Sequence, residues 1–239
     1  MGDNGTRIAI VTGGSRGIGR GIVEALSVEG WRVRFCSRSP KSVEEAEMEL
    51  ARRFGDAVSG AAVDVRNQEE VDRFVREAVE REGRIDCLVN NAGLGTFGPV
   101  DELTGDQWRE VIDTNLSGCF YFLHAVAPVM KRQGTGWIFN VASLAGKNPF
   151  AGGAAYNASK FGLIGLSEAA MLDLRQSGVR VAAILPGSVA TGFSHPSGGQ
   201  DQSWRLQPAD IASMVLHLLT YPPNALPSLV EMRPAKPPK

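Results

Sequence analysis

The sequence predicts an α/β fold, a doubly wound parallel sheet of seven strands with helices on both faces. Seven short runs of apolar and β-branched residues alternate along the 239-residue chain with segments in which apolar residues recur at helical spacing. A glycine-rich loop follows the first run and precedes a helix. Because parallel strands need crossover connections of one hand and must be covered on both sides, this alternation indicates helices on each face.

The first strand is expected at residues 7–12, a β-branched-rich run that stops at Gly13-Gly14 as a buried parallel strand should. Six further strands are expected at residues 33–36, 57–63, 87–89, 137–141, 179–185 and 229–232. Helices are expected between them at residues 18–29, 43–54, 69–82, 107–131, 154–176 and 208–219.

No shift in composition and no internal repeat divides the chain, so residues 1–239 are expected to form a single domain. Residues 187–207 are rich in Ser, Gly and Gln and follow the sixth strand, where α/β sheets bind ligands, so we expect a substrate lid there. The Pro-rich tail at 234–239 cannot continue a sheet, and we expect it to be frayed or docked on a neighbour.

The composition excludes several function classes. The chain has 25 basic and 26 acidic residues, so it has no broad cationic surface for a nucleic acid. Its three cysteines are an odd number at wide spacings, which predicts reduced thiols and no metal site. The N-terminus lacks the layout of a signal peptide, and polar residues interrupt the longest apolar stretch. We therefore expect a cytoplasmic protein with no nucleic-acid or membrane partner.

The glycine-rich loop at residues 12–19 has the spacing GxxxGxG. Gly13 is expected to take a positive φ at the turn, Gly17 to let backbone amides approach a pyrophosphate, and Gly19 to let the helix pack closely. The positive end of the helix then stabilises the anion. The alternative is a glycine-rich turn without a ligand. The loop residues expected to bind a dinucleotide are Gly13, Ser15, Arg16, Gly17, Ile18 and Gly19.

The end of the second strand favours NADP(H) over NAD(H). Dinucleotide-binding folds usually place an acidic residue there for the ribose 2′-hydroxyl, but this chain has Ser37 followed by Arg38. A hydroxyl and a guanidinium suit a 2′-phosphate better than a diol. Arg16 in the glycine loop can supply a second cation. The alternative is that each arginine is a solvated surface charge.

Tyr156 and Lys160 lie at i and i+4, hence on one face of a helix. An ammonium fixed near a phenol typically lowers the phenol pKa by about 1–3 units, toward a useful acid–base range. The pair alone is a weak signal, because any helix can carry it by chance. Further polar groups stand at strand ends or on facing helices. They are Asn90-Asn91-Ala92-Gly93, Asn115, Ser143 and Pro186-Gly187.

With these motifs in this order, the sequence resembles the short-chain dehydrogenase/reductase family, in its single-domain branch, over nearly the whole chain. The resemblance implies a Rossmann fold and a catalytic set of Asn115, Ser143, Tyr156 and Lys160. Tyr156 would protonate the carbonyl oxygen during reduction, or take the hydroxyl proton in the reverse direction. Ser143 would hydrogen-bond the same oxygen. Lys160 would bind the nicotinamide ribose and lower the tyrosine pKa, and Asn115 would hold a water that links Lys160 to solvent.

The resemblance also implies cofactor contacts beyond the glycine loop and Ser37-Arg38. Tyr156 and Lys160 would contribute to cofactor binding as well as to catalysis. Asp64 and Val65 would face the adenine. The residues expected along the remainder of the cofactor are Asn91, Ala92 and Gly93 at the sugars and Pro186, Gly187, Val189 and Thr191 at the nicotinamide end. Taken singly, Asn115 could be a buried helix asparagine, Asp64 a turn former and Ser143 a loop hydroxyl.

The nearest subgroup is the 3-oxoacyl-thioester reductases, because residues 157–165 read NASKFGLIG as they do there. The segment after Pro186-Gly187 is shorter than in those reductases, and the chain lacks their VDGG-like ending. Leu144, Phe150 and Phe193, with Phe97 and Val189, suggest an apolar substrate pocket suited to a ketone or aldehyde with hydrophobic substituents.

The expected function is NADPH-dependent reduction of a ketone or aldehyde, the reverse of alcohol oxidation (EC 1.1.1 type). One alternative is a 3-oxoacyl-[acyl-carrier-protein] reductase. Another is a non-catalytic NADP(H)-binding sensor or scaffold, and a third is a sugar-nucleotide epimerase or dehydratase of the extended branch, whose loop is usually GxxGxxG.

Members of the family commonly form tetramers through two long helices, which here correspond to residues 107–131 and 154–176. These helices offer more apolar surface than one sheet face absorbs, so we expect a homotetramer. The alternative is that the apolar faces are used within one chain. The apolar residues concerned are Leu116, Phe120, Leu123, Met130, Phe161, Leu166, Ala169 and Met171.

Overall fold

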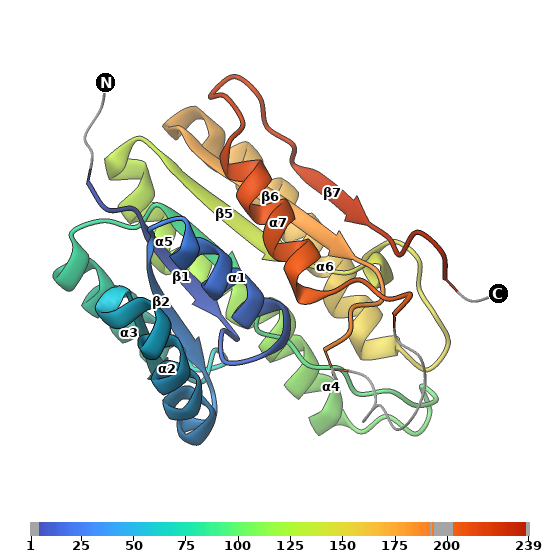
Figure 1. Cartoon of the computed structure of the whole chain (residues 1–239). Coiled ribbons are helices and arrows are strands. Elements are labelled where there is room, and N and C mark those ends of the chain that lie inside the picture. Colours follow the sequence, from blue (N-terminus) through green and yellow to red (C-terminus); the bar gives the residue numbers. More distant parts are fainter. Residues whose placement is uncertain (1–4, 192, 194–202, 238–239) are drawn as a thin grey trace.

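The computed structural model describes residues 5–191, 193 and 203–237, which form a single twisted sheet covered by helices (Figure 1). The strands are β1 (Ile8–Thr12), β2 (Arg32–Ser37), β3 (Val58–Ala62), β4 (Cys87–Asn90), β5 (Gly136–Val141), β6 (Val179–Pro186) and β7 (Leu229–Met232). The helices are α1 (Gly17–Val28), α2 (Pro40–Phe54), α3 (Gln68–Glu82), α4 (Gly105–Ile112), α5 (Gly118–Gln133), α6 (Ala154–Leu174) and α7 (Pro208–Leu219).

The seven strands are all parallel and lie in the order β3-β2-β1-β4-β5-β6-β7. The order reverses between β1 and β4, because β2 and β3 extend the sheet to one side and β4 to β7 extend it to the other. Ligands bind at the carboxyl ends of the strands beside such a reversal. The predicted doubly wound fold with seven strands is confirmed.

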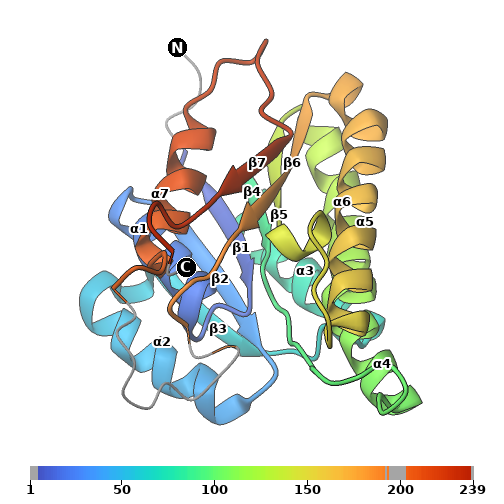
Figure 2. The ribbon, with the colours of Figure 1, turned by 90° about the vertical axis from the view of Figure 1, so that its right-hand side faces the viewer.

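Two layers of helices cover the sheet (Figure 2). One apolar core packs α1, α2 and α7 against one face, and a second packs α3, α5 and α6 against the other. Successive strand residues alternate between the cores: Ala9 and Val11 of β1 belong to the first, while Ile10 belongs to the second. Because both faces are buried, the strands read as continuous apolar runs, and this is why they could be located in the sequence.

The prediction of one continuous helix at residues 107–131 is wrong. The structure divides it into α4 and α5, which are joined by a π-helical turn at Asp113–Ser117. A π turn inserts one residue into the helical ladder and re-aims the side chains within it. Asn115 lies in this turn and is fully buried. The sequence periodicity could not reveal the turn, since the contacts that select it come from other elements.

The first and last described parts of the predicted lid lie side by side. Residues 192 and 194–202 of the lid, including His195, lie outside the described part of the chain. Val189 and Leu206 form a parallel bridge, in which the Ala190 amide donates to the Leu206 carbonyl at 2.9 Å. The tail starts against the same region, because a Cβ atom on Gly187 would lie 2.9 Å from Pro234. No helix among the described residues is long and apolar enough to cross a bilayer.

Candidate active site

The glycine-rich loop connects β1 to α1 at the carboxyl edge of the sheet. Gly13 has a φ of 66°, which confirms the positive value predicted for it, and Gly17 also has a positive φ, of 57°. Only glycine adopts such values without strain. A Cβ atom on Gly19 would meet the carbonyl oxygen of Gly13 and the side-chain nitrogen of Asn91, so a side chain at this position would separate α1 from the loop. The predicted close packing at Gly19 is therefore present.

The first turn of α1 is left open to an anion. Arg16 stands at the N-cap position, where no side chain accepts a hydrogen bond from the helix, and the first turn contains no acidic residue. The N–H groups and positive dipole end of this helix are therefore available to a pyrophosphate. This feature fits a dinucleotide better than a ligand-free turn, because a helix start without a function would normally be capped.

Asn91 links the end of β4 to the end of β1. Its side-chain amide donates to the Thr12 carbonyl at 2.9 Å, and its backbone amide donates to the Thr12 hydroxyl at 2.9 Å. The Ala92 amide donates to the same hydroxyl at 2.9 Å. The Asn91 side chain thus holds the loop, so any contact from this loop to a ribose would come from its backbone. Thr12, which anchors both amides, was not singled out by the sequence analysis.

Ser143 and Tyr156 are brought together from the end of β5 and the first turns of α6. The Ser143 side chain favours the phenolate form of Tyr156, but burial has the larger effect and raises the pKa of Tyr156. The net direction of the Tyr156 pKa is therefore upward, and the expectation that Lys160 lowers it stays a prediction. The rise comes from desolvation, since the phenol is largely withdrawn from water and the Lys160 ammonium lies 5.8 Å from the ring centroid.

Lys160 is buried one turn after Tyr156. The residue is only 5% exposed, and its ammonium donates a hydrogen bond to the Val141 carbonyl at 2.9 Å. Burial lowers the pKa of Lys160 to about 8. A carbonyl satisfies only one of the three donors of an ammonium. The arrangement can therefore serve ribose hydroxyls and a phenolate at the same time.

Asn115 holds the active-site helix in position. Its carbonyl oxygen accepts from the Leu94 amide at 2.8 Å, and its NH2 group donates to the Leu94 carbonyl at 2.8 Å and to the Ser159 hydroxyl at 3.0 Å. Ser159 in turn donates to the Tyr156 carbonyl at 2.8 Å. Both N–H donors of Asn115 are thereby used, and the π turn lies at the centre of a clamp that joins the loop after β4 to α6.

A second buried polar chain supports α6 farther along. Asn90 donates to Asn140 at 2.9 Å across the β4–β5 pair, Asn140 donates to Ser167 at 2.8 Å, and Ser167 donates to the Leu163 carbonyl at 2.6 Å. Sequence reasoning missed Asn140, Ser159 and Ser167. The available signal was an asparagine in the middle of a buried strand and two serines on an otherwise apolar helix face.

Three phenylalanines surround the Tyr156 ring. Phe97 and Phe193 have ring centroids 5.7 and 5.8 Å from it, and Phe150 lies at 6.5 Å. Each belongs to a different loop, after β4, β5 and β6, and each is between 41% and 46% exposed. Leu144 lies beside Gly187, with 3.2 Å between its side chain and a Cβ built there. The three phenylalanines therefore form a partly exposed apolar surface around the Tyr156 ring.

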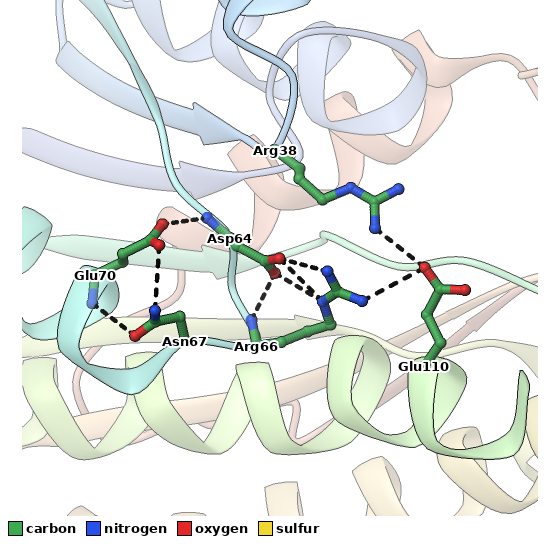
Figure 3. Close-up of polar contacts among 6 residues, drawn as sticks. All are labelled: Arg38, Asp64, Arg66, Asn67, Glu70 and Glu110. Atoms are coloured by element: carbon green, nitrogen blue, oxygen red, sulfur yellow. Dashed lines mark hydrogen bonds and ion pairs between the residues drawn. The ribbon is translucent and has the colours of Figure 1, made fainter. Parts of the chain in front are cut away.

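The predicted adenosine end contains hydroxyls and ions at the ends of β2 and β3. Ser37 donates to the Ser15 hydroxyl at 2.9 Å and so connects β2 with the glycine loop. Arg38 forms an ion pair with Glu110 of α4 at 3.1 Å (Figure 3). The Asp64 carboxylate accepts hydrogen bonds from the guanidinium of Arg66, and this pairing holds the pKa of the Asp64 carboxyl below its ordinary value. Neither Arg66 nor Glu110 was identified from the sequence.

The remaining predicted cofactor residues line the same edge. A Cβ atom on Gly17 would lie 3.4 Å from the Thr191 side chain. A Cβ atom on Gly93 would lie 3.2 Å from the side-chain oxygen of Asn115. Val65 is buried against Gly118, at the start of α5. The structure thus brings the glycine loop, the loop after β4 and the segment after β6 together at the carboxyl edge of the sheet.

Comparison with known proteins gives one consistent result. The family model described as short chain dehydrogenase matches residues 7–202. An uncharacterised oxidoreductase of Staphylococcus saprophyticus is 34% identical over 232 residues, 95% of this chain and 97% of the relative. An alcohol dehydrogenase of the archaeon Thermococcus sibiricus, solved with 5-hydroxy-NADP, superposes with a TM-score of 0.89 at 30% identity, over 98% of this chain and 99% of that one. Actinorhodin polyketide ketoreductase, solved with NADPH, superposes with a TM-score of 0.87 at 31% identity, over 98% of both chains.

Proposed function

Because the chain belongs to the short-chain dehydrogenase/reductase family of oxidoreductases, we propose that it reduces a ketone or aldehyde with NADPH, or oxidises the corresponding alcohol. The observation that carries the proposal is the position of the Tyr156 ring, which lies 5.8 Å from the Lys160 ammonium and is surrounded by the partly exposed rings of three phenylalanines. A binding scaffold has no need of two half-buried hydroxyl groups beside a buried ammonium.

The proton chemistry follows from the burial of the two titratable groups. The bound cofactor supplies the hydride. The raised pKa of Tyr156 keeps its phenol protonated at neutral pH, so it can donate its proton to the carbonyl oxygen as negative charge develops there. Ser143 donates a hydrogen bond to the same oxygen. When the cofactor is bound, Lys160 would hold its ribose hydroxyls. Lys160 would also stabilise the phenolate that remains after proton transfer, because opposite charges attract strongly in a desolvated site.

NADP(H) is the proposed cofactor, in preference to NAD(H). Support comes from Ser37 and Arg38 at the end of β2, and from Arg16, which is exposed and forms no ion pair with any described residue. The alcohol dehydrogenase of T. sibiricus and the polyketide ketoreductase named above were solved with NADP-type cofactors. The glycine loop completes the proposed cofactor site.

The proposed substrate carries hydrophobic substituents. The phenylalanine rings around Tyr156 leave apolar surface open to solvent, and filling it with an apolar group is favourable by about 25 cal/mol for each Å² removed from water. The alternative substrate is a 3-oxoacyl thioester. The similarity to a polyketide ketoreductase favours this alternative, whereas the ending without a VDGG-like segment does not.

We propose a homotetramer in the cytoplasm, with α5 and α6 at the interface. Phe120 and Phe161 on these helices are 47% and 45% exposed, which leaves apolar surface for a partner. The expectation that Leu123 and Met130 contribute to that surface is wrong, because both are buried in the core of their own chain. Light scattering coupled to size-exclusion chromatography at micromolar concentration tests the assembly, and a monomer mass would reject it.

The proposed activity is tested by NADPH oxidation against a panel of ketones, diketones and acyl thioesters, with NADH in parallel. We expect turnover of hydrophobic ketones or aldehydes. Turnover of acyl thioesters alone would favour the alternative, and NADPH binding without turnover of any carbonyl in the panel would favour a sensor or scaffold.

A further inference from the structure

Two arginines from different loops converge on one oxygen atom. The Nη1 atom of Arg38, directly after β2, lies 3.1 Å from Oε1 of Glu110. The Nη1 atom of Arg66, after β3, lies 3.5 Å from the same Oε1. Figure 3 shows both guanidinium groups pointing toward the Glu110 carboxylate, which reaches them from α4. A point where two guanidinium groups meet is a position suited to an anion.

Arg66 is held so that only one edge of its guanidinium remains available. Its Nε and Nη2 atoms are fixed on the Asp64 carboxylate at 2.9 and 2.5 Å, and the Asp64 carboxylate also accepts from the Arg66 backbone amide at 3.0 Å. Asp64 therefore orients Arg66 while leaving Nη1 directed at Glu110. Because Asp64 already fixes the Arg66 side chain, Arg66 loses less conformational entropy when it binds an anion.

We propose that Arg38 and Arg66 together form the site for the 2′-phosphate of NADP(H), and that Glu110 occupies this site as an internal anion when the cofactor is absent. Glu110 is then a specificity-determining residue, because the phosphate must displace it. The inference rests on the proposed preference for NADP(H). It adds Arg66 to Arg16, which the sequence suggested as the second cation.

The charges and exposures of the three side chains make this exchange possible. Arg38, Arg66 and Glu110 are 60%, 34% and 40% exposed, and exposed ion pairs are weak because water screens them. A phosphate offers more oxygens and more charge than a carboxylate, so it can bridge both guanidinium groups with charge-assisted hydrogen bonds. A carboxylate left nearby repels it. NAD(H) lacks the phosphate and neither displaces Glu110 nor is repelled in this way.

The test measures binding and needs no turnover. Dissociation constants for 2′,5′-ADP and 5′-AMP are measured by calorimetry, and those for NADPH and NADH by fluorescence, with wild type, Glu110→Gln and Arg66→Gln. The control is Glu102→Gln, which removes the same charge from an exposed position just before α4. Glu110→Ala is the second variant at the key position, and thermal unfolding establishes that each variant is folded.

We expect Glu110→Gln and Glu110→Ala to tighten 2′,5′-ADP and NADPH about three- to tenfold, because a nearby repelling and competing charge is lost. The same variants should change 5′-AMP and NADH by less than about twofold. Arg66→Gln should weaken 2′,5′-ADP and NADPH about tenfold, while Glu102→Gln should behave as wild type. The gain from Glu110→Gln should shrink in the double variant with Arg66→Gln, since the two residues act on one anion.

Two results overturn the inference, and they are distinguishable. If wild type prefers NADPH but the Glu110 variants bind like Glu102→Gln and Arg66→Gln keeps full discrimination, the cluster is a surface ion-pair network and the proposed function stands. If wild type binds 2′,5′-ADP and 5′-AMP equally, the preference for NADP(H) fails, and the inference fails with it.

Discussion

The ammonium of Lys160 donates a hydrogen bond to the carbonyl oxygen of Val141 at 2.9 Å, at the point where β5 ends. No carboxylate of a described residue forms an ion pair with this ammonium. A buried charge without a counter-ion is costly, and this cost is expressed in the lowered pKa of Lys160. A protein keeps such a charge where another molecule supplies the missing partner.

The pH dependence of cofactor binding should therefore report on Lys160. Its pKa of about 8 in the folded protein lies below the ordinary value near 10.4, so the ammonium loses its charge as the pH rises through about 8. We expect the affinity for NADPH to decline above pH 8, measured by fluorescence titration. The variant Lys160→Met should bind more weakly and show no such decline. A wild-type affinity that is constant from pH 7 to 9.5 would contradict this assignment.

The same substitution should stabilise the protein. Since the folded state holds the Lys160 proton less tightly than the unfolded state, the charged side chain opposes folding below pH 8, and this penalty fades as the pH rises from 8 toward 10.4. Chemical unfolding at pH 7 should therefore show Lys160→Met to be more stable by about 1–3 kcal/mol, with a smaller difference at pH 10. Loss of stability at pH 7 would mean that the hydrogen bond to Val141 outweighs desolvation.

Tyr156→Phe should separate catalysis from cofactor binding. The deleted hydroxyl acts on the carbonyl oxygen in the transition state, so we expect kcat for reduction to fall about 10²–10⁴-fold while the dissociation constant for NADPH changes little. Tyr221→Phe, remote from the site at the end of α7, is the matched control and should keep full activity. If Tyr156→Phe reduces its best substrate within threefold of wild type, the assigned mechanism is wrong and another proton donor must be sought.

Arg38→Ala should weaken the preference for NADP(H). A charge-assisted hydrogen bond to phosphate contributes about 1.5–3 kcal/mol, so the ratio of the NADPH and NADH dissociation constants should shift tenfold or more toward NADH. Arg38→Asp should shift it further, because the new carboxylate repels the phosphate and can accept from the ribose diol. Equal dissociation constants of wild type for the two cofactors would reject the premise.

Asn115→Ala should reduce activity through position rather than through chemistry. The variant loses three hydrogen bonds that connect Leu94 and Ser159, and it leaves buried partners unsatisfied, which destabilises the fold by about 1–3 kcal/mol. Because Ser159 bonds the Tyr156 carbonyl, kcat should fall as well. The exposed Asn224→Ala, in the loop after α7, is the control for chemical denaturation and kinetics. Unchanged stability in Asn115→Ala would contradict the clamp.

The fold could be predicted from the sequence because its determinants are local. Both faces of the sheet are covered, so each strand appears as an apolar run, and the helices carry their own periodicity. The glycine loop could be predicted for the same reason, since the backbone has a positive φ at Gly13 and Gly17, which favours glycine. Tyr156 and Lys160 share a helix face by their spacing alone, and the family resemblance rests on such short, ordered motifs.

Only the tertiary structure decided how residues far apart in the chain meet. It divided the helix at Asn115 by a π turn and placed that side chain between Leu94 and Ser159. It brought Glu110 to Arg38 and Arg66, three positions that no local pattern connects. It also decided the direction of the Tyr156 pKa, because desolvation depends on what surrounds a group in space, whereas spacing along a helix reports only which charge is near.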